Sequence, residues 1–256
     1  MPGKFMGYSA HGAYSQKMES WLKKNEYFKN IWGRKHMFFD RVRKGWNREM
    51  RSFDTKDPFL QDVAATFQHI FQRELLKKIQ ALQEETGATY LYYTGGSALN
   101  IKVNTALIES GLFRDVFIPP CTNDSGLSIG AGALVEWCKH GSVGNHSPFL
   151  NNWFLNEAEM DYPDKELGRI ARILSDGQVV GVSNGYGETG PRALGNRSIL
   201  ARADSVKLSH YVSRSLKRRE WYRPVAPVML GRNLAYFTGI SHTPSLSRYM
   251  LMDFTI

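Results

Sequence analysis

Apolar residues recur every three or four positions along residues 57–87, and this spacing predicts a long amphipathic helix. Residues 88–96 are apolar, rich in tyrosine and end in two glycines, which is typical of a buried strand that runs into a turn. A helix is expected over 97–111, a second strand over 114–120 and, after a loop, a helix rich in small residues within 121–141. This alternation of strands and helices predicts an α/β layered domain.

The pattern then breaks in a polar stretch over residues 146–163, which we interpret as a linker. A new unit begins near residue 164 with a helix, a glycine turn and a strand. Residues 204–230 predict a further helix, a basic turn and an apolar run that resembles a strand. We therefore expect one domain over 1–145 and a second over 164–256.

Composition narrows the class of protein. The chain has 256 residues, of which 42% are hydrophobic, as in globular proteins with real cores. No apolar run approaches the roughly 20 residues that span a bilayer, and the start lacks the apolar stretch of a signal peptide. Cys121 and Cys138 offer neither a disulfide framework nor a metal-binding pair. We expect a cytoplasmic protein without a membrane partner.

The formal net charge of +9 suits nucleic acid, a membrane surface or phosphorylated small molecules. Much of this charge lies in residues 21–51 and 213–223. The aromatic residues within 21–51 are compatible with base stacking or with the buried side of amphipathic helices, and the second arrangement is commoner. A solvated basic face is the simplest interpretation of this first run.

The turn after the first predicted strand contains Gly95 and Gly96, which let a ligand approach the backbone closely. The helix that follows presents unpaired N–H groups suited to a phosphate. Asn100 and Asn104 are four residues apart and share one side of that helix. The segment lacks the Gly–Lys–Ser/Thr ending of a Walker A motif, and a plain strand-to-helix turn remains the alternative.

Asp124 stands where the next helix begins, so it suits either an N-cap or a metal or phosphate ligand. Three glycines nearby, Gly126, Gly130 and Gly132, allow close packing or close approach of a ligand. No two histidines are spaced four apart as metal ligands on one helix, so the chain by itself does not predict a metal site.

The segment "GETGPRALGNRSIL", residues 187–200, combines glycines and a proline with Arg192 and Arg197. Guanidinium groups bind phosphate or carboxylate oxygens in pairs, and backbone N–H groups in such a loop add to an anion nest. Asn196 and Ser198 supply neutral hydrogen bonds. Three further cations follow downstream: Lys217, Arg219 and Arg223. We favour an anion pocket over a solvated basic loop.

These segments resemble the NodU/CmcH O-carbamoyltransferase family. "GETGPRALGNRSILA" resembles its most recognisable segment, and "KRREWYRPVAPVML" the one that follows. "GGSALNIKVN" and "VFIPPCTNDSGLSIGAGAL" are similar to two earlier motifs, "DVAATFQHIFQRE" to the helix before them, and "GKFMGYSAHG" to an upstream segment. The motifs occur in the same order along nearly the whole chain.

The resemblance implies part of an actin-like ATPase (RNase H-like) domain followed by part of a YrdC-like α/β domain. It implies that carbamoyl phosphate and ATP react to give carbamoyl adenylate, and that the carbamoyl group passes to a hydroxyl of a small molecule such as a sugar. No catalytic residue is assigned.

The resemblance also implies site residues. The region that handles carbamoyl phosphate and nucleotide comprises Arg192, Asn196, Arg197, Ser198, Lys217, Arg219 and Arg223. The nucleotide-side turn of the first domain comprises Gly95, Gly96, Ser97 and Asn100. Asp124 matches the family's aspartate ligand for iron or a similar divalent ion.

The sequence departs from the family in several places. The family's histidine ligands belong to a segment that this chain lacks, and a C-terminal part has no counterpart, so the chain resembles a central fragment. We expect an incomplete metal site, reduced activity, and a second copy or a partner chain that supplies missing parts. Ser213 replaces a usual asparagine, and "ARADS" replaces a usual Asp-Pro-Arg, which alters the surroundings of Arg202.

Two other functions remain as alternatives. One is a tRNA threonylcarbamoylation protein, which shares the architecture of the first domain and would contact tRNA through residues 21–51. The other is a basic nucleic-acid-binding module without catalysis. The "GPRALGNRS" segment argues against the tRNA threonylcarbamoylation protein, because by resemblance it belongs to the small-molecule branch. The resemblance as a whole ranks the carbamoyltransferase ahead of both alternatives, so nucleic acid is not the expected partner.

Overall fold

The computed structural model describes residues 2–28, 37–144, 147–151, 164–241 and 243–254. The chain forms two compact units, Met1–Thr86 and Gly87–Ile256. The predicted linker, 146–163, lies largely outside the described residues, and the domain boundaries that we expected from the sequence stay a prediction.

The first unit is helical. Its helices are α1 (Pro2–Ser9), α2 (Gln16–Lys24), α3 (Phe38–Trp46) and α4 (Pro58–Thr86). Helix α4 confirms the helix predicted over 57–87, and its residues Val63 and Ile70 are buried as the spacing requires. The side chain of Ser15 caps α2 by accepting the N–H of Met18.

Aromatic residues of the early basic stretch lie in the core of this unit. Trp21, Tyr27 and Phe38 are buried together with aliphatic residues of α4. The ring of Trp21 meets that of Phe38 edge-on at 6.0 Å. Trp21, Tyr27 and Phe38 therefore serve the core and are not available for stacking on bases, whereas Phe28 is 44% exposed.

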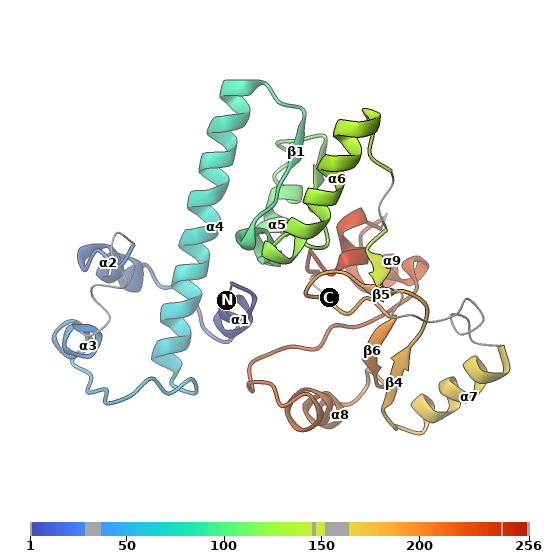
Figure 1. Cartoon of the computed structure of the whole chain (residues 1–256). Helices are drawn as coiled ribbons and strands as arrows, with labels where there is room; N and C mark the ends of the chain where they lie inside the picture. Colours follow the sequence, from blue (N-terminus) through green and yellow to red (C-terminus); the bar gives the residue numbers. More distant parts are fainter. Residues whose placement is uncertain (1, 29–36, 145–146, 152–163, 242, 255–256) are drawn as a thin grey trace. The chain divides into compact units, whose positions relative to one another are not determined.

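The second unit begins with a parallel pair of strands, β1 (Tyr90–Tyr92) and β2 (Asp115–Phe117). Between them lie the 3₁₀ turn η2 (Gly96–Leu99) and helix α5 (Ile101–Glu109). A short 3₁₀ turn η3 (Asp124–Gly126) and α6 (Leu127–His140) follow. The strands and helices predicted for this region are confirmed in order, with shorter strands than the apolar runs suggested (Figure 1).

Two antiparallel strand pairs follow in the second unit. Strand β3 (Phe149–Asn151) pairs with β5 (Gly187–Glu188), and β4 (Val180–Ser183) pairs with β6 (Arg197–Leu200). The remaining elements are α7 (Asp164–Ser175), α8 (Val206–His210), the π-helix η5 (Tyr211–Leu216), α9 (Gly231–Thr238) and η6 (Ser245–Tyr249).

The apolar run 224–230 does not form a strand. Pro224 and Pro227 lack the N–H groups that a sheet ladder needs, and Val228 is 84% exposed. The prediction of a strand here is therefore wrong.

The last described residues pack on the parallel strands. Leu246, Leu251 and Met252 share a buried cluster with Val116 and Ile118. The buried amide of Asn104 donates to the carbonyls of Ala98 and Leu251, at 2.9 and 2.8 Å. Asn104 therefore ties the chain end to α5.

Mixed helices and sheets confirm the α/β class, whereas the actin-like and YrdC-like assignments stay predictions. Among the helices of the described ranges, none combines the length and the apolar character that crossing a membrane requires.

Candidate anion-binding site

The loop after β5 is built around the carboxylate of Glu188. Its Oε1 accepts the backbone N–H groups of Leu194, Asn196 and Arg197 at 2.7, 2.7 and 3.0 Å. Partial burial raises the pKa of Glu188, but the backbone hydrogen bonds lower it, and the net effect is a pKa below the usual value. The carboxylate therefore stays charged near neutral pH and fixes the backbone of the loop.

Arg197 closes the loop from the other side. Its guanidinium donates to the backbone carbonyls of Asn184 (2.9 Å), Asn196 (2.9 Å) and Gly185 (3.0 Å). These bonds occupy both terminal nitrogens, so the structure gives Arg197 a structural role in the loop. Its assignment to carbamoyl phosphate stays a prediction.

Asn196 and Ser198 also serve the loop itself. The amide of Asn196 donates to the carbonyl of Tyr186 at 2.8 Å, and the hydroxyl of Ser198 accepts the N–H of Gly195 at 3.1 Å. The structure therefore brings these predicted site residues together, as parts of the frame of the loop.

Arg192 differs from Arg197. Its Nε is buried and has no hydrogen-bond partner among the described residues. Burial lowers the pKa of Arg192, and the nearby guanidiniums of Arg223 and Arg219 lower it further. Glu220 pairs with Arg223 at 3.6 Å, but the buried Nε of Arg192 has no such acceptor in the described part of the chain, so Arg192 is the residue of the loop best suited to bind an anion.

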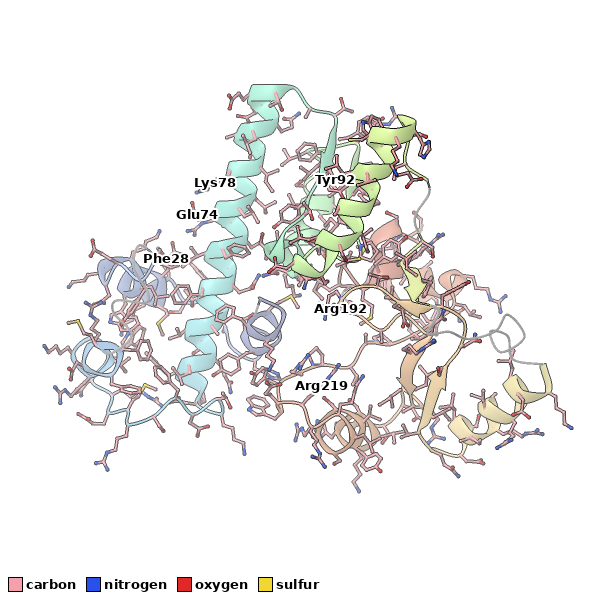
Figure 2. All side chains as sticks on the ribbon, in the orientation of Figure 1. Phe28, Glu74, Lys78, Tyr92, Arg192 and Arg219 are labelled. Atoms are coloured by element: carbon pink, nitrogen blue, oxygen red, sulfur yellow. The ribbon has the colours of Figure 1, made fainter. Side chains whose placement is uncertain are left out.

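The downstream cations belong to the same cluster. Burial lowers the pKa values of Lys217 and Arg219, and Arg223 lowers both further. Arg192 and Arg219, labelled in Figure 2, come from the loop after β5 and from the segment after η5. We call Arg192, Lys217, Arg219 and Arg223 the cation cluster.

Backbone and side-chain hydrogen bonds fix the segment that carries Lys217, Arg219 and Arg223. The backbone N–H of Lys217 donates to the carbonyl of Val212 at 3.0 Å. The backbone N–H of Arg219 donates to the carbonyl of Ser213 at 2.9 Å. The buried hydroxyl of Ser213 donates to the carbonyl of Arg223 at 3.2 Å. Ser213, which departs from the family pattern, therefore joins the start of this segment to its end.

The loop after β5 that carries Arg192, which we call the arginine loop, lies against the segment that follows β2. Gly190 has a φ of +112°, and a Cβ atom there would lie 2.8 Å from the carbonyl oxygen of Pro120. Two residues after Pro120, the backbone carbonyl of Thr122 accepts the N–H of Gly95 at 2.8 Å. The hydroxyl of Thr122 donates to the carbonyl of Gly95 at 2.7 Å. The glycine turn after β1 and the arginine loop thus both contact the segment that follows β2.

The predicted nucleotide-side residues surround that glycine turn. Gly95 has a φ of +97°, and an added Cβ would meet no atom within 4 Å at Gly95 or Gly96. The backbone carbonyl of Ser97 accepts the N–H of Asn100. The buried side chain of Asn100 accepts the N–H of Val103 as the N-cap of α5. The turn is open to a ligand, whereas Asn100 has a structural role; the nucleotide assignment stays a prediction.

Asp124 lies at the first position of η3, and its side chain is exposed. Asn123 is the N-cap of η3 and Gly126 that of α6, so Asp124 caps neither element. Within the described residues, no group of three His, Cys, Asp or Glu side chains could hold a metal ion. The described residues therefore do not by themselves fit an iron site, and the assignment of Asp124 as a metal ligand stays a prediction.

Comparisons with known proteins agree with the order of these segments. A family model described as "Carbamoyltransferase N-terminus" matches residues 3–133, and one described as "Carbamoyltransferase C-terminus" matches residues 171–256. The chain belongs to the carbamoyltransferase family. The C-terminal match contains the Glu188 loop and the cation cluster, and the N-terminal match contains the glycine turn and Asp124.

Curated carbamoyltransferase relatives are much longer than this chain. Nodulation protein U of Azorhizobium caulinodans is 38% identical over 199 residues, which are 75% of this chain and 35% of the relative. Nodulation protein NolO of Bradyrhizobium diazoefficiens is 30% identical over 256 residues, 91% of this chain and 46% of the relative. The chain thus spans about a third to a half of these relatives' length.

Sequence reasoning missed Glu188, the residue around which this candidate site is built. A single carboxylate inside a basic, glycine-rich loop is the signal that could have identified it, because such a group needs several N–H donors. Arg202 donates to the carbonyl of Ser175 at the end of α7, at 2.6 Å, and pairs with Asp204 at 2.7 Å.

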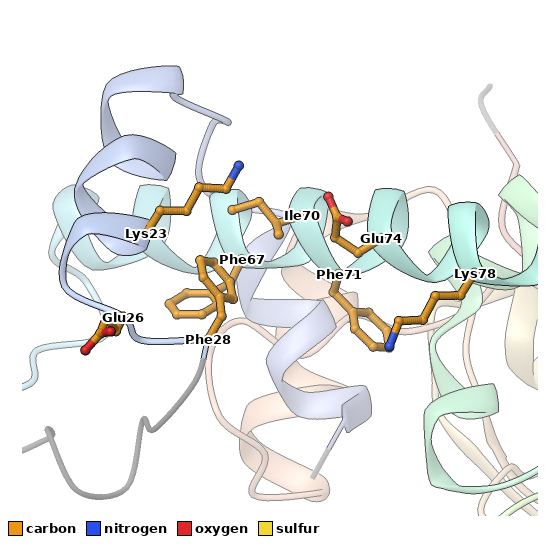
Figure 3. Close-up of a pocket in the computed structure, with 8 residues that line it drawn as sticks. All are labelled: Lys23, Glu26, Phe28, Phe67, Ile70, Phe71, Glu74 and Lys78. Atoms are coloured by element: carbon orange, nitrogen blue, oxygen red, sulfur yellow. The ribbon is translucent and has the colours of Figure 1, made fainter.

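A hollow of about 620 Å³ lies in the first unit (Figure 3). Its lining residues are Lys23, Glu26, Phe28, Phe67, Ile70, Phe71, Glu74 and Lys78. The rings of Phe28 and Phe67 lie 4.8 Å apart, and Glu74 pairs with Arg73 at 2.9 Å. Four of its eight lining residues are apolar and Glu74 is engaged by Arg73, so we assign this hollow no catalytic role.

Proposed function

We propose that this carbamoyltransferase chain takes part in carbamoylating a hydroxyl of a small molecule, a natural product or sugar. Carbamoyl phosphate and ATP are the co-substrates, with carbamoyl adenylate as the carrier of the group. Family membership supports carbamoyl transfer. The observation that carries the choice of substrate is the cation cluster, in which Arg192 has a buried Nε without a partner among the described residues.

The cation cluster suits a phosphate for an electrostatic reason. Burial and mutual repulsion lower the pKa values of Arg192, Lys217 and Arg219, so a bound dianion would relieve an unfavourable interaction. A guanidinium grips two oxygens of a phosphate at once. Positive groups in place before the reaction also stabilise charge that develops when a phosphoryl or acyl group is transferred.

The glycine turn is the proposed nucleotide contact. Gly95 and Gly96 are exposed and leave room for close approach, and backbone N–H groups follow in η2. The turn and the arginine loop both contact the segment after β2, at Thr122 and Pro120. This arrangement supports a function in which both segments serve one reaction sequence.

Iron or a similar divalent ion belongs to the proposal only through the family resemblance. Asp124 would be one ligand, and the described residues do not complete a group of three such ligands around it. We therefore assign no step to a metal. A second copy or a partner chain that completes the site is part of the same proposal.

Isothermal titration calorimetry with carbamoyl phosphate tests the proposal. Arg192→Ala should weaken binding about 10- to 100-fold, because it removes a charged donor from the phosphate. Arg169→Ala is the matched control: it also removes one positive charge, but from an exposed ion pair with Glu166 on α7, and should change the affinity less than about twofold. Equal binding by the wild type and Arg192→Ala would contradict the assignment of the site.

A further inference from the structure

Glu188 places a negative charge inside a loop that we propose to bind an anion. Such a charge would oppose anion binding if it faced the ligand. Instead, one oxygen accepts three backbone N–H groups of the loop. We propose that Glu188 is a positioning residue of the anion site, which fixes the backbone of the loop so that Arg192 is held ready for the phosphate. This inference rests on the proposed function, because it needs the cation cluster to be the anion site.

Arg192 stands midway between two fixed points of the backbone. Two residues before it, Gly190 packs against the carbonyl of Pro120. Two residues after it, the N–H of Leu194 is bound by Glu188 at 2.7 Å. The position of the Arg192 guanidinium depends on the position of the backbone that carries it. A shift of about 1 Å is enough to impair binding by such a group.

The bonds of Arg197 alone cannot replace those of Glu188. Arg197 joins the carbonyls of Asn184, Gly185 and Asn196, which lie on either side of the loop base. Glu188 instead binds N–H groups, including that of Leu194 within the loop. The carboxylate and the guanidinium thus satisfy opposite kinds of backbone group, and losing the carboxylate would leave three N–H donors without their acceptor.

Whether anion binding becomes weaker or stronger when the carboxylate of Glu188 is removed distinguishes a positioning role from a purely electrostatic one. By electrostatics alone, removing a carboxylate near a cation cluster strengthens anion binding or leaves it unchanged. By positioning, the same change weakens anion binding, because Arg192 is no longer held. The two explanations predict opposite changes in affinity.

The experiment uses sulfate, a dianion that is not a substrate, and carbamoyl phosphate, titrated into the whole chain by calorimetry. Glu188→Gln should weaken sulfate binding about 3- to 10-fold, since it keeps one acceptor oxygen but loses the charge that strengthens the bonds. Glu188→Ala should weaken it more than about 10-fold. The control Glu166→Gln removes a negative charge from the exposed face of α7 and should change the affinity less than about twofold.

A double-mutant cycle shows whether Glu188 acts through Arg192. In the Arg192→Ala background, Glu188→Gln should change the sulfate affinity less than about twofold, because the group that it positions is absent. An unchanged multiplicative loss would contradict positioning, as would equal or tighter sulfate binding by Glu188→Gln. If Glu188→Ala does not fold, the sulfate affinity of Glu188→Gln and the double-mutant cycle still test the positioning role. Failure of the wild type to bind either anion would instead contradict the proposed function itself.

Discussion

The guanidinium of Arg197 donates to the backbone carbonyl of Asn184, with 2.9 Å between nitrogen and oxygen. Further bonds to the carbonyls of Asn196 and Gly185 occupy the same guanidinium. The buried Nε of Arg192, in the same loop, has no partner in the part of the chain that the structure describes. One arginine therefore closes the backbone of the loop, whereas the other keeps a buried donor without an acceptor among the described residues.

Arg197→Lys should lower the free energy of unfolding by about 2 kcal/mol, because an ammonium group cannot reproduce the planar set of donors that reaches three carbonyls. The shift of the urea midpoint measures this loss. Arg169→Lys, on the exposed face of α7, is the control and should leave the midpoint unchanged. A midpoint of Arg197→Lys equal to that of the wild type would refute the structural role.

Unlike Arg197→Lys, Arg192→Met should not lower the free energy of unfolding. In a buffer without sulfate or phosphate, we expect unchanged stability or a gain of about 1 kcal/mol, because the change removes a buried cation beside Arg219 and Arg223. Adding sulfate should raise the thermal midpoint of the wild type more than that of the variant, since a ligand stabilises only the state that binds it. A variant that sulfate stabilises as strongly as the wild type would show that the anion binds elsewhere.

The sequence could predict helix α4 because apolar residues recur at helical spacing along much of its length. Val63 and Ile70 follow that spacing and are buried, whereas Phe71 is 40% exposed. The run 224–230 misled the same reasoning, because apolar character suggested a strand while Pro224 and Pro227 removed the donors that pairing requires. Apolar composition without a consistent period and without backbone donors is thus weak support for a strand.

The candidate site could be predicted as a region but not residue by residue. Glycines, a proline and arginines identified the loop as an anion nest. Which arginine is free depends on where the carbonyls of Asn184 and Gly185 lie, and that follows from the pairing of β4 with β6. Local composition does not encode that pairing.

Glu19 in the first unit gives a prediction on pH. Its buried carboxylate binds Arg73 through two hydrogen bonds, of 3.1 and 2.8 Å, and also binds Lys23 and Tyr14. Arg73 makes the largest contribution to lowering the pKa of Glu19 to about 2. Since the folded state favours the ionised form, the stabilisation is present above about pH 4.5 and is lost as the pH falls towards about 2.

Glu19→Gln should therefore cost on the order of 2 kcal/mol at pH 7. Between pH 5 and pH 3 its stability should fall less than that of the wild type, because the variant has no carboxylate to protonate at this position. Urea unfolding at several pH values measures both effects. Glu85→Gln, at an exposed position near the end of α4, is the control and should follow the wild type. Parallel pH profiles for Glu19→Gln and the wild type would contradict this account.

Gly190 and Gly195 form a matched pair that tests the contact between the arginine loop and the segment after β2. Their φ angles are +112° and +116°, so alanine is strained to a similar extent at both. An added Cβ at Gly190 would lie 2.8 Å from the carbonyl oxygen of Pro120, whereas at Gly195 it would meet nothing within 4 Å. The two substitutions therefore differ mainly in that one clash.

Gly195→Ala should lower the free energy of unfolding by about 1–3 kcal/mol, the usual cost of such backbone strain. Gly190→Ala should cost clearly more, because backbone atoms at Pro120 cannot move aside as a flexible side chain would. Urea midpoints of the two variants measure the difference. Equal midpoints would mean that the loop does not pack on Pro120 in solution. A larger loss for Gly190→Ala, accompanied by weaker sulfate binding, would show that this contact also helps to hold Arg192 in place.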